Sequence, residues 1–75
     1  MITSTDHANR VCTLTHNGQP INVGEILEDF RGNYFRVTGG QAPHKPSSSG
    51  KVSTDGGDYY PTVFDCQWTP TNQGA

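Results

Sequence analysis

The segment from 42 to 51, APHKPSSSGK, concentrates side chains that could bind an anion. Lysine supplies positive charge, serine hydroxyls donate hydrogen bonds, and a glycine lets a ligand approach the backbone. The candidate binding residues of this segment are His44, Lys45, Ser47, Ser48, Ser49 and Lys51. The alternative is a tether, with serines that are solvated and prolines that restrict its movement. The sequence leaves both interpretations open.

Three departures from the pattern argue against a nucleotide-hydrolysing phosphate loop here. Such a loop reads Gly-x-x-x-x-Gly-Lys-Ser/Thr and precedes a helix. Gly50-Lys51 supplies the second half, but Lys45 occupies the position of the first glycine. Val52 follows the lysine and has no hydroxyl for magnesium, and the residues after it are typical of a strand. We therefore expect no nucleotide cofactor.

A second candidate surface combines tyrosines with arginines. The candidate residues are Arg31, Tyr34, Arg36, Tyr59 and Tyr60. Exposed aromatic rings beside basic groups can stack bases and pair with phosphates, and Tyr and Arg also dominate protein interfaces. In each adjacent pair of aromatic residues, strand alternation predicts one buried and one exposed ring. The tyrosines could equally cover a thin core.

The residues that could hold a metal or perform catalysis are scattered. The chain has three histidines and two cysteines, and no pair of histidines has the spacing of a metal site. Glu28 and Asp29 are adjacent, so on a strand they point to opposite faces. Asp55 and Asp58 flank a glycine pair, where turn geometry explains both. The sequence predicts no metal, no cofactor, no catalytic residue and no enzyme activity.

Cys12 and Cys66 are expected to be free thiols, because each lies in an apolar, strand-like run that suits a small buried side chain. A disulfide between them is the alternative. A Cys-dependent enzyme is a distant alternative, since buried thiols are usually inert. The N-terminus lacks the basic start and apolar run of a signal peptide, and no segment approaches the ~20 apolar residues of a membrane span. These features predict a cytoplasmic protein without membrane contact.

The length and composition indicate one small domain with little core. The chain has 75 residues, of which 31% are hydrophobic, so self-association could add to its stability. Its formal net charge of −2 excludes a general attraction for nucleic acid or anionic lipid. Charge is nevertheless segregated, because residues 42–53 carry no acid and residues 54–65 carry no base.

Short alternating runs separated by turn residues indicate β-strands. Residues 10–15 form the first run, and Asn17-Gly18 predicts a tight hairpin that returns through residues 19–23, with Pro20 at an edge. Residues 25–30 and 33–38 flank a second turn at Arg31-Gly32. We interpret residues 25–30 as a strand, and a short helix is the alternative.

The last third of the chain continues this pattern. Residues 51–54 form a strand, residues 55–58 form a turn, and residues 59–68 form a further run that Pro61 breaks or places at an edge. The expected core residues are Val11, Leu14, Ile21, Ile26, Leu27, Phe30, Phe35, Val37, Val52, Val63, Phe64 and Trp68.

The fold class predicted from these elements is mainly β, either a small antiparallel meander or an SH3-like barrel of five to six short strands, with room for one short helical turn. We expect a flexible N-terminus over residues 1–9, one β domain over residues 10–69 and a flexible C-terminus over residues 70–75.

The segment from Val23 to Trp68 resembles small bacterial and phage proteins. The resemblance lies in Gly24, the Asp29-Phe30-Arg31-Gly32 turn, Pro43, Ser49-Gly50-Lys51-Val52, and Tyr60-Pro61 before a Phe and a Trp. These residues are turn glycines and aromatic residues, so the resemblance implies a fold and a phage or prophage origin but no activity. The hairpin over residues 24–37 is also similar to hairpins of SH3-like barrels, by analogy of fold alone.

Together these features predict a small interaction module that binds a protein partner or itself. The alternative function is binding of nucleic acid or a small anionic ligand through the Arg, Lys and Tyr residues named above.

Overall fold

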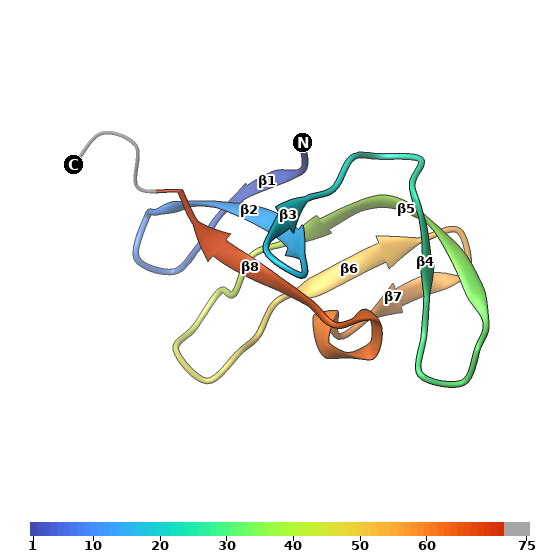
Figure 1. The fold of residues 1–75 in the computed structure, drawn as a ribbon. Helices are drawn as coiled ribbons and strands as arrows, with labels where there is room; N and C mark the ends of the chain where they lie inside the picture. The colour runs from blue at the N-terminus through green and yellow to red at the C-terminus, as the bar shows by residue number, and fades with distance from the viewer. Residues whose placement is uncertain (72–75) are drawn as a thin grey trace.

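The computed structural model describes residues 1–71, which form two antiparallel sheets and one short 3-10 helix (Figure 1). The first sheet contains β1 (Thr3–Thr5), β2 (Val11–His16), β3 (Gln19–Pro20) and β8 (Cys66–Pro70). The second sheet contains β4 (Ile26–Glu28), β5 (Tyr34–Gln41), β6 (Lys51–Thr54) and β7 (Gly57–Tyr59). The 3-10 helix η1 (Pro61–Phe64) connects β7 to β8. The mainly β fold predicted from the sequence is confirmed, as a small meander.

β2 is the central strand of the first sheet. β1 and β3 both pair with one of its edges, and β8 pairs with the other. The turn from β2 to β3 lies at Asn17 and Gly18, which have φ angles of 53° and 81°. Positive φ at both central positions is what a type I′ turn requires, so the predicted tight hairpin is confirmed.

β4 and β5 form the predicted second hairpin, and residues 26–28 are strand rather than helix. The carboxylate of Asp29 accepts hydrogen bonds from the amides of Arg31 and Asn33 at 2.9 and 2.8 Å. Gly32 has a φ of 85°, in the left-handed region that glycine tolerates. The turn is therefore stabilised by its own side chains, and it directs β5 back along β4.

η1 replaces the first half of the long strand that alternation predicts over residues 59–68. Pro61 opens η1 because its fixed φ suits a helical first turn and its ring nitrogen cannot donate to a sheet. Asp65 ends η1 in the left-handed conformation, with a φ of 57°. Cys66 and Trp68 then point into the core from β8, as alternation predicts.

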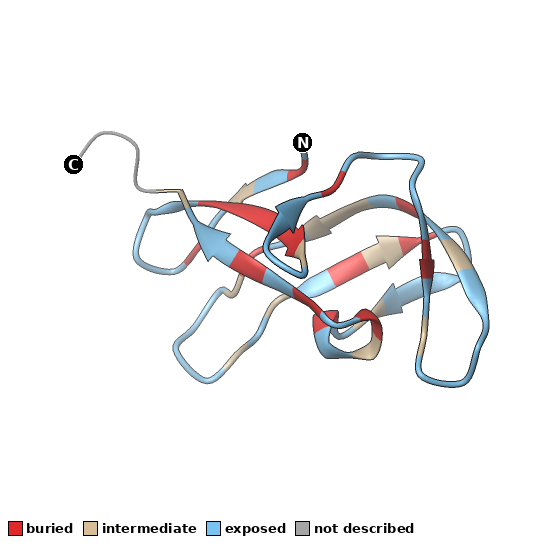
Figure 2. Ribbon diagram, viewed as in Figure 1, coloured by how far each residue is buried: buried red, intermediate tan, exposed pale blue. Residues whose placement is uncertain are grey.

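One core lies between the two sheets (Figure 2). Its buried hydrophobic residues are Ile2, Cys12, Leu14, Ile21, Leu27, Val37, Ala42, Val52, Phe64, Cys66 and Trp68. Three residues expected in the core are instead exposed: Val11 at 50%, Ile26 at 52% and Phe30 at 75%. Ile26 points outward because its neighbour Leu27 points inward, and Phe30 lies in the turn after β4.

Trp68 connects β8 of the first sheet to the β5–β6 hairpin of the second. Its indole Nε1 donates to the carbonyl oxygen of Lys51 at 3.2 Å. Gly40 and Gly50 lie so close to the indole that a Cβ atom on either would be 2.7 Å from a ring carbon. The two glycines therefore allow the indole to pack against the hairpin backbone.

The predicted barrel is not formed, because the two sheets stay separate and β4 is an end strand of its sheet. β3 is only two residues long. The Ile21 amide still donates to the Leu14 carbonyl oxygen at 3.2 Å, so the ring nitrogen of Pro20 points away from β2 and offers no donor to a further strand on that side. η1 occupies the chain between β7 and β8 where a further strand would be needed. Among residues 1–71, the second sheet thus keeps open edges at β4 and at β7.

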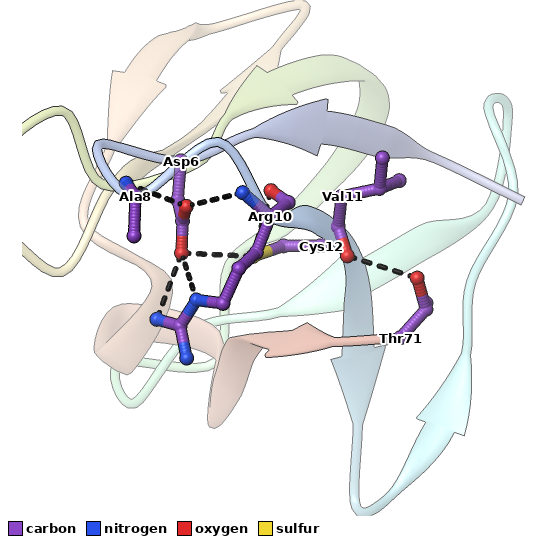
Figure 3. Close-up of polar contacts among 6 residues, drawn as sticks. All are labelled: Asp6, Ala8, Arg10, Val11, Cys12 and Thr71. Carbon is purple, nitrogen blue, oxygen red and sulfur yellow. Dashed lines mark hydrogen bonds and ion pairs between the residues drawn. The ribbon is translucent and has the colours of Figure 1, made fainter. Parts of the chain in front are cut away.

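Residues 1–9, predicted to be a flexible terminus, contain a strand and a core residue. β1 pairs with β2, and Ile2 is part of the core. Asp6 is buried, and its carboxylate accepts hydrogen bonds from the amides of Ala8 and Arg10 and from the Arg10 guanidinium (Figure 3). The turn that follows β1 is therefore fixed by a polar cluster that hydrophobic patterning cannot detect.

At the other end, β8 includes Pro70, and the Thr71 hydroxyl donates to the carbonyl oxygen of Val11 at 2.9 Å (Figure 3). The rest of the predicted flexible C-terminus, residues 72–75, lies outside the described residues. Between residues 1 and 71, no helix has the length and apolar character needed to cross a membrane.

Candidate functional site

The loop between β5 and β6 borders an open hollow of about 670 Å³, here called the loop hollow. It is lined by Gln41, His44, Lys45, Ser47, Ser48, Ser49, Gly50, Lys51 and Tyr60. All six candidate residues of the 42–51 segment are among them, together with Tyr60 from the second candidate set. The structure therefore brings seven of the eleven predicted binding residues together.

Hydrogen bonds attach the start of the loop to β1 and to the turn after it, and a bond within the loop shapes its end. The Ala42 amide donates to Ser4 Oγ at 3.0 Å, and the Pro43 carbonyl accepts from the His7 amide at 2.9 Å. At the other end, the Gly50 amide donates to Ser48 Oγ at 3.1 Å. The start of the segment is thus held against the fold, and one of its serines shapes its end.

The positive charge in the loop hollow is partly neutralised. Lys51 Nζ forms an ion pair with Asp58 Oδ2 at 3.3 Å, and both side chains are about half exposed. Hydrogen bonds from Ser53 and Lys51 lower the pKa of the Asp58 carboxyl, which keeps it ionised. Lys45 forms no ion pair with any residue from 1 to 71. One lysine is therefore available for an anion.

The remaining four predicted residues do not line the loop hollow, although Tyr59 lines an adjoining hollow with Lys51 and Tyr60 and another with Arg31. The guanidinium of Arg31 lies over the Phe30 ring, 5.3 Å from its centroid. Arg36 lies on β5, opposite Ile26 of β4. The half-buried ring of Tyr59 packs 5.1 Å from Phe35 in an aromatic cluster. The single Arg, Lys and Tyr face expected from the sequence is thus divided between different surfaces.

A second hollow of about 630 Å³, here called the β4 groove, was not predicted. It lies between β4 on one side and η1 and the end of β2 on the other. Its lining comprises His16, Ile21, Glu25, Ile26, Leu27, Glu28, Asp29, Phe30, Tyr34, Thr62, Val63 and Asp65. Tyr34, predicted as a binding residue, lies here rather than at the loop hollow.

Three large apolar side chains of the groove are exposed. Ile26, Phe30 and Tyr34 are 52%, 75% and 70% accessible. Tyr34 is the Cα partner of Glu28 in the hairpin, so it shares the outer face of the sheet with Ile26. The alternation of Ile26, Leu27 and Glu28 was the signal that could have identified this face, because only one side of a three-residue strand can face the core.

The free edge of β4 borders the same groove. The pairing of Leu27 with Phe35, and the bond from the Asp29 amide to Asn33, show that odd-numbered residues of β4 face β5. The amide and carbonyl groups of Ile26 and Glu28 therefore point away from β5. Within the described part of the chain, no strand pairs with them.

The cysteines do not form a disulfide, and both are buried. Cys66 pairs with His16, four residues along β2 from Cys12, which separates the two Cα atoms by roughly 13 Å. A disulfide needs Cα atoms within about 7 Å. Burial and the nearby Asp65 charge raise the pKa of Cys66 to about 11, and burial also raises that of Cys12. At neutral pH both sulfurs are protonated and are weak nucleophiles.

No three His, Cys, Asp or Glu side chains of residues 1–71 are arranged to hold a metal ion. Glu28 lies on β4, whereas Asp29 stabilises the turn after it. Asp55 accepts a hydrogen bond from the Arg36 amide at 3.2 Å, and Asp58 pairs with Lys51. Each of these last two acids thus has a structural partner.

No family model, curated protein or solved structure matches the chain. The resemblance to small bacterial and phage proteins therefore stays a prediction.

Proposed function

We propose that this protein is a small interaction module that binds a protein partner through the β4 face. The β4 face consists of Ile26, Phe30 and Tyr34, the free edge of β4 and the β4 groove. The observation that carries the proposal is the coincidence of an unpaired strand edge with exposed apolar side chains beside one groove. Proteins usually cover or charge such edges unless a partner pairs with them.

The composition of the β4 face favours a protein over a small molecule. Aromatic residues and arginine contribute most of the binding energy in many interfaces. Phe30 and Tyr34 supply two aromatic rings, and Arg31 is already stacked on Phe30. Burial of each large apolar side chain contributes about 1.5–3 kcal/mol, so this cluster alone could support a transient complex.

The first test compares capture of proteins by the wild type and by a Phe30→Ser/Tyr34→Ser variant. Each is immobilised and exposed to a lysate of the organism that encodes the chain, and captured proteins are quantified by mass spectrometry. We expect a defined set of proteins to be lost on the double variant. Val11→Thr is the control, because Val11 is also an exposed apolar residue, at 50%, but lies on β2. Equal capture by all three proteins would contradict the proposal.

Self-association is the competing use of the same face. Light scattering of the wild type at high concentration should report a monomer if the partner is a different protein. A dimer that the Phe30→Ser/Tyr34→Ser variant abolishes would identify a second copy as the occupant.

A second candidate function is binding of a small anion or of nucleic acid at the loop hollow. The observation that favours it is the gathering of His44, Lys45 and Tyr60 around one hollow, with Lys45 unpaired among residues 1–71. A fluorescent oligonucleotide should then bind at low salt, and it should bind more weakly as salt rises. Lys45→Gln should weaken this binding more than Lys51→Gln, since the Lys51 charge already pairs with Asp58. Equal effects of the two variants would count against this site.

We also propose a cytoplasmic location and a phage or prophage origin. Two buried thiols without a disulfide support the first, since reducing compartments keep cysteines in this state. The sequence resemblance alone supports the second.

A further inference from the structure

We infer that the partner segment at the β4 face is an extended peptide that adds to β4 as a further strand and carries basic side chains. This inference rests on the proposed function and specifies the chemistry of the partner. It follows from three features of the groove, namely its strand edge, its alternating faces and its charge.

The edge supplies the backbone contacts for an added strand. The amides and carbonyls of Ile26 and Glu28 point away from β5 and toward the space where a neighbouring strand would lie, about 4.8 Å away. η1, with Thr62 and Val63, forms the opposite wall of the groove. An extended chain between these walls would satisfy the open edge, as in other proteins that bind peptides by strand addition.

The two faces of β4 impose an alternating pattern on that peptide. Ile26 and Glu28 lie on the outer face with Tyr34, whereas Leu27 points inward. A peptide residue that lies opposite Glu28 would share its outer face, and the next residue would point inward toward Leu27 and Val63. The inner positions therefore suit apolar residues, whereas on the outer face the position beside Glu28 suits a polar residue and the position beside Ile26 suits an apolar one.

Charge decides which polar residues fit. The groove is lined by Glu25, Glu28, Asp29 and Asp65, against one histidine, His16. Two of the acids already have backbone partners, because Glu25 accepts from the Asn22 amide and Asp29 accepts from amides of its own turn. Glu28 and Asp65 are exposed and form no ion pair with residues 1–71. These two carboxylates, one on each wall, would attract lysine or arginine of the peptide.

The test is a selection from a random linear twelve-residue peptide library displayed on phage, with the folded wild-type protein as the target. We expect the enriched peptides to carry net positive charge and to alternate basic with apolar residues. A synthetic peptide of the most enriched sequence should bind more weakly as salt rises.

The edge is tested separately from the charge. Ile26→Pro removes an amide that points to the groove and leaves the bonds to β5 in place, because Ile26 is not a residue that bonds to β5. It should weaken peptide binding by about tenfold or more, the loss expected when backbone hydrogen bonds to the peptide cannot form. Ile26→Thr is the matched control, since it keeps the amide and a β-branched side chain. Equal binding by both variants would contradict strand addition.

If Ile26→Pro does not fold, a charge-reversal variant, Glu28→Lys/Asp65→Lys, tests the inference instead. Both positions are exposed, so the substitutions do not disturb the core. Selection on this variant should enrich acidic peptides. N-methylation of alternate residues in the wild-type peptide should abolish binding in one of the two registers and preserve it in the other, because only one set of amides faces β4.

The outcomes separate this inference from the proposed function. Enriched peptides that are neutral or acidic, or that bind the charge-reversal variant equally well, would overturn the inference and leave a protein-binding β4 face. A dimer of the wild type that Ile26→Pro abolishes would also overturn the inference, because a second copy of the chain would then occupy the β4 face. No enrichment of any peptide, together with no captured protein lost on Phe30→Ser/Tyr34→Ser, would overturn both.

Discussion

Asp6 is a buried carboxylate whose charge is compensated within one turn of chain. The amides of Ala8 and Arg10 donate to one oxygen at 2.9 Å each, and the Arg10 Nε donates to the other at 2.8 Å (Figure 3). Burial by itself would raise the pKa of Asp6, but the hydrogen bonds from Arg10 and Ala8 outweigh it and lower the pKa to about 2. The ionised form of Asp6 therefore stabilises the turn between β1 and β2.

This cluster predicts an acid-sensitive contribution to stability. A carboxyl with a pKa of about 2 in the folded state and about 3.9 in the unfolded state favours folding above pH 4. The contribution is lost as the pH falls from about 4 to about 2. Asp6→Asn should lower the thermal midpoint at pH 7 and reduce the dependence of the midpoint on pH in that window.

Circular dichroism melts from pH 2 to pH 7 measure this effect. Asp65→Asn is the control, because Asp65 is exposed and forms no ion pair with any of residues 1–71. If the thermal midpoint of Asp6→Asn falls with pH as steeply as that of the wild type, Asp6 is not the source of the acid sensitivity.

The two thiols provide a second prediction at this scale. Burial raises the pKa of both, and that of Cys66 reaches about 11. At pH 8 the thiolate fraction of Cys66 is then on the order of one in a thousand. A disulfide reagent should react with Cys12 and Cys66 far more slowly in the native protein than in denaturant. Native labelling of either thiol at the unfolded rate would reopen the Cys-dependent alternative.

At the scale of elements, the contact between β8 and the β5–β6 hairpin depends on close approach of Trp68 to backbone. Gly40 lies on β5 beneath the indole, where a Cβ atom would be 2.7 Å from both the Lys51 carbonyl oxygen and a ring carbon. Its neighbour Gly39 would place a Cβ atom in open space. Two adjacent glycines of one strand therefore have different structural roles.

This difference predicts unequal effects of the same substitution. Gly40→Ala should destabilise the fold by about 1–3 kcal/mol, the usual cost of overpacking against groups that cannot move freely. Gly39→Ala should change stability by less than about 0.5 kcal/mol, as is usual for surface positions. Urea denaturation of both variants measures the free energies of unfolding. Similar values for the two would contradict the packing described for Trp68.

For the molecule as a whole, the two sheets share one core rather than each having its own. The core residues Cys12, Leu14 and Trp68 come from the first sheet, whereas Val37 and Val52 come from the second (Figure 2). Neither sheet buries an apolar face without the other. The two sheets are therefore expected to unfold together.

Trp68 is the single tryptophan of the chain and lies at the junction, so its fluorescence reports separation of the sheets. Far-UV circular dichroism reports loss of the strands themselves. Urea titrations followed by the two signals should give the same midpoint, and Gly40→Ala should shift both midpoints equally. Two distinct midpoints would show that one sheet persists without the other.

The two surfaces of the molecule also differ in charge. The loop hollow contains Lys45 and Lys51, whereas the β4 groove contains Glu28 and Asp65 among its acids. A basic partner segment and an anion would therefore bind at different places. The segregation of charge visible in the sequence between residues 42–53 and 54–65 only partly anticipates this division, because Glu28 belongs to neither segment.

The local features of this protein follow from its amino-acid sequence alone. Asn17-Gly18 specifies a hairpin through its tolerance of positive φ, and Pro61 interrupts a strand because its ring nitrogen cannot donate a hydrogen bond. Alternation within residues 34–37 correctly separates exposed from inward-facing side chains, as the exposed Tyr34 and the buried Val37 show. These features depend on backbone preferences that act over a few residues.

Which strand edges pair, and which apolar side chains remain exposed, depends on the tertiary fold. β1 forms because residues 3–5 pair with an edge of β2. Asp6 is held by a hydrogen bond from Arg10, and no hydrophobic pattern in the sequence indicates such a polar contact. Ile26 and Phe30 are apolar and would suit a core, yet they remain on the surface because Ile26 lies on the outer face of its sheet and Phe30 lies in the turn after β4. Strand pairing joins residues distant in sequence, so the position of an open edge, and with it the proposed binding groove, follows from the assembled fold and not from local pattern.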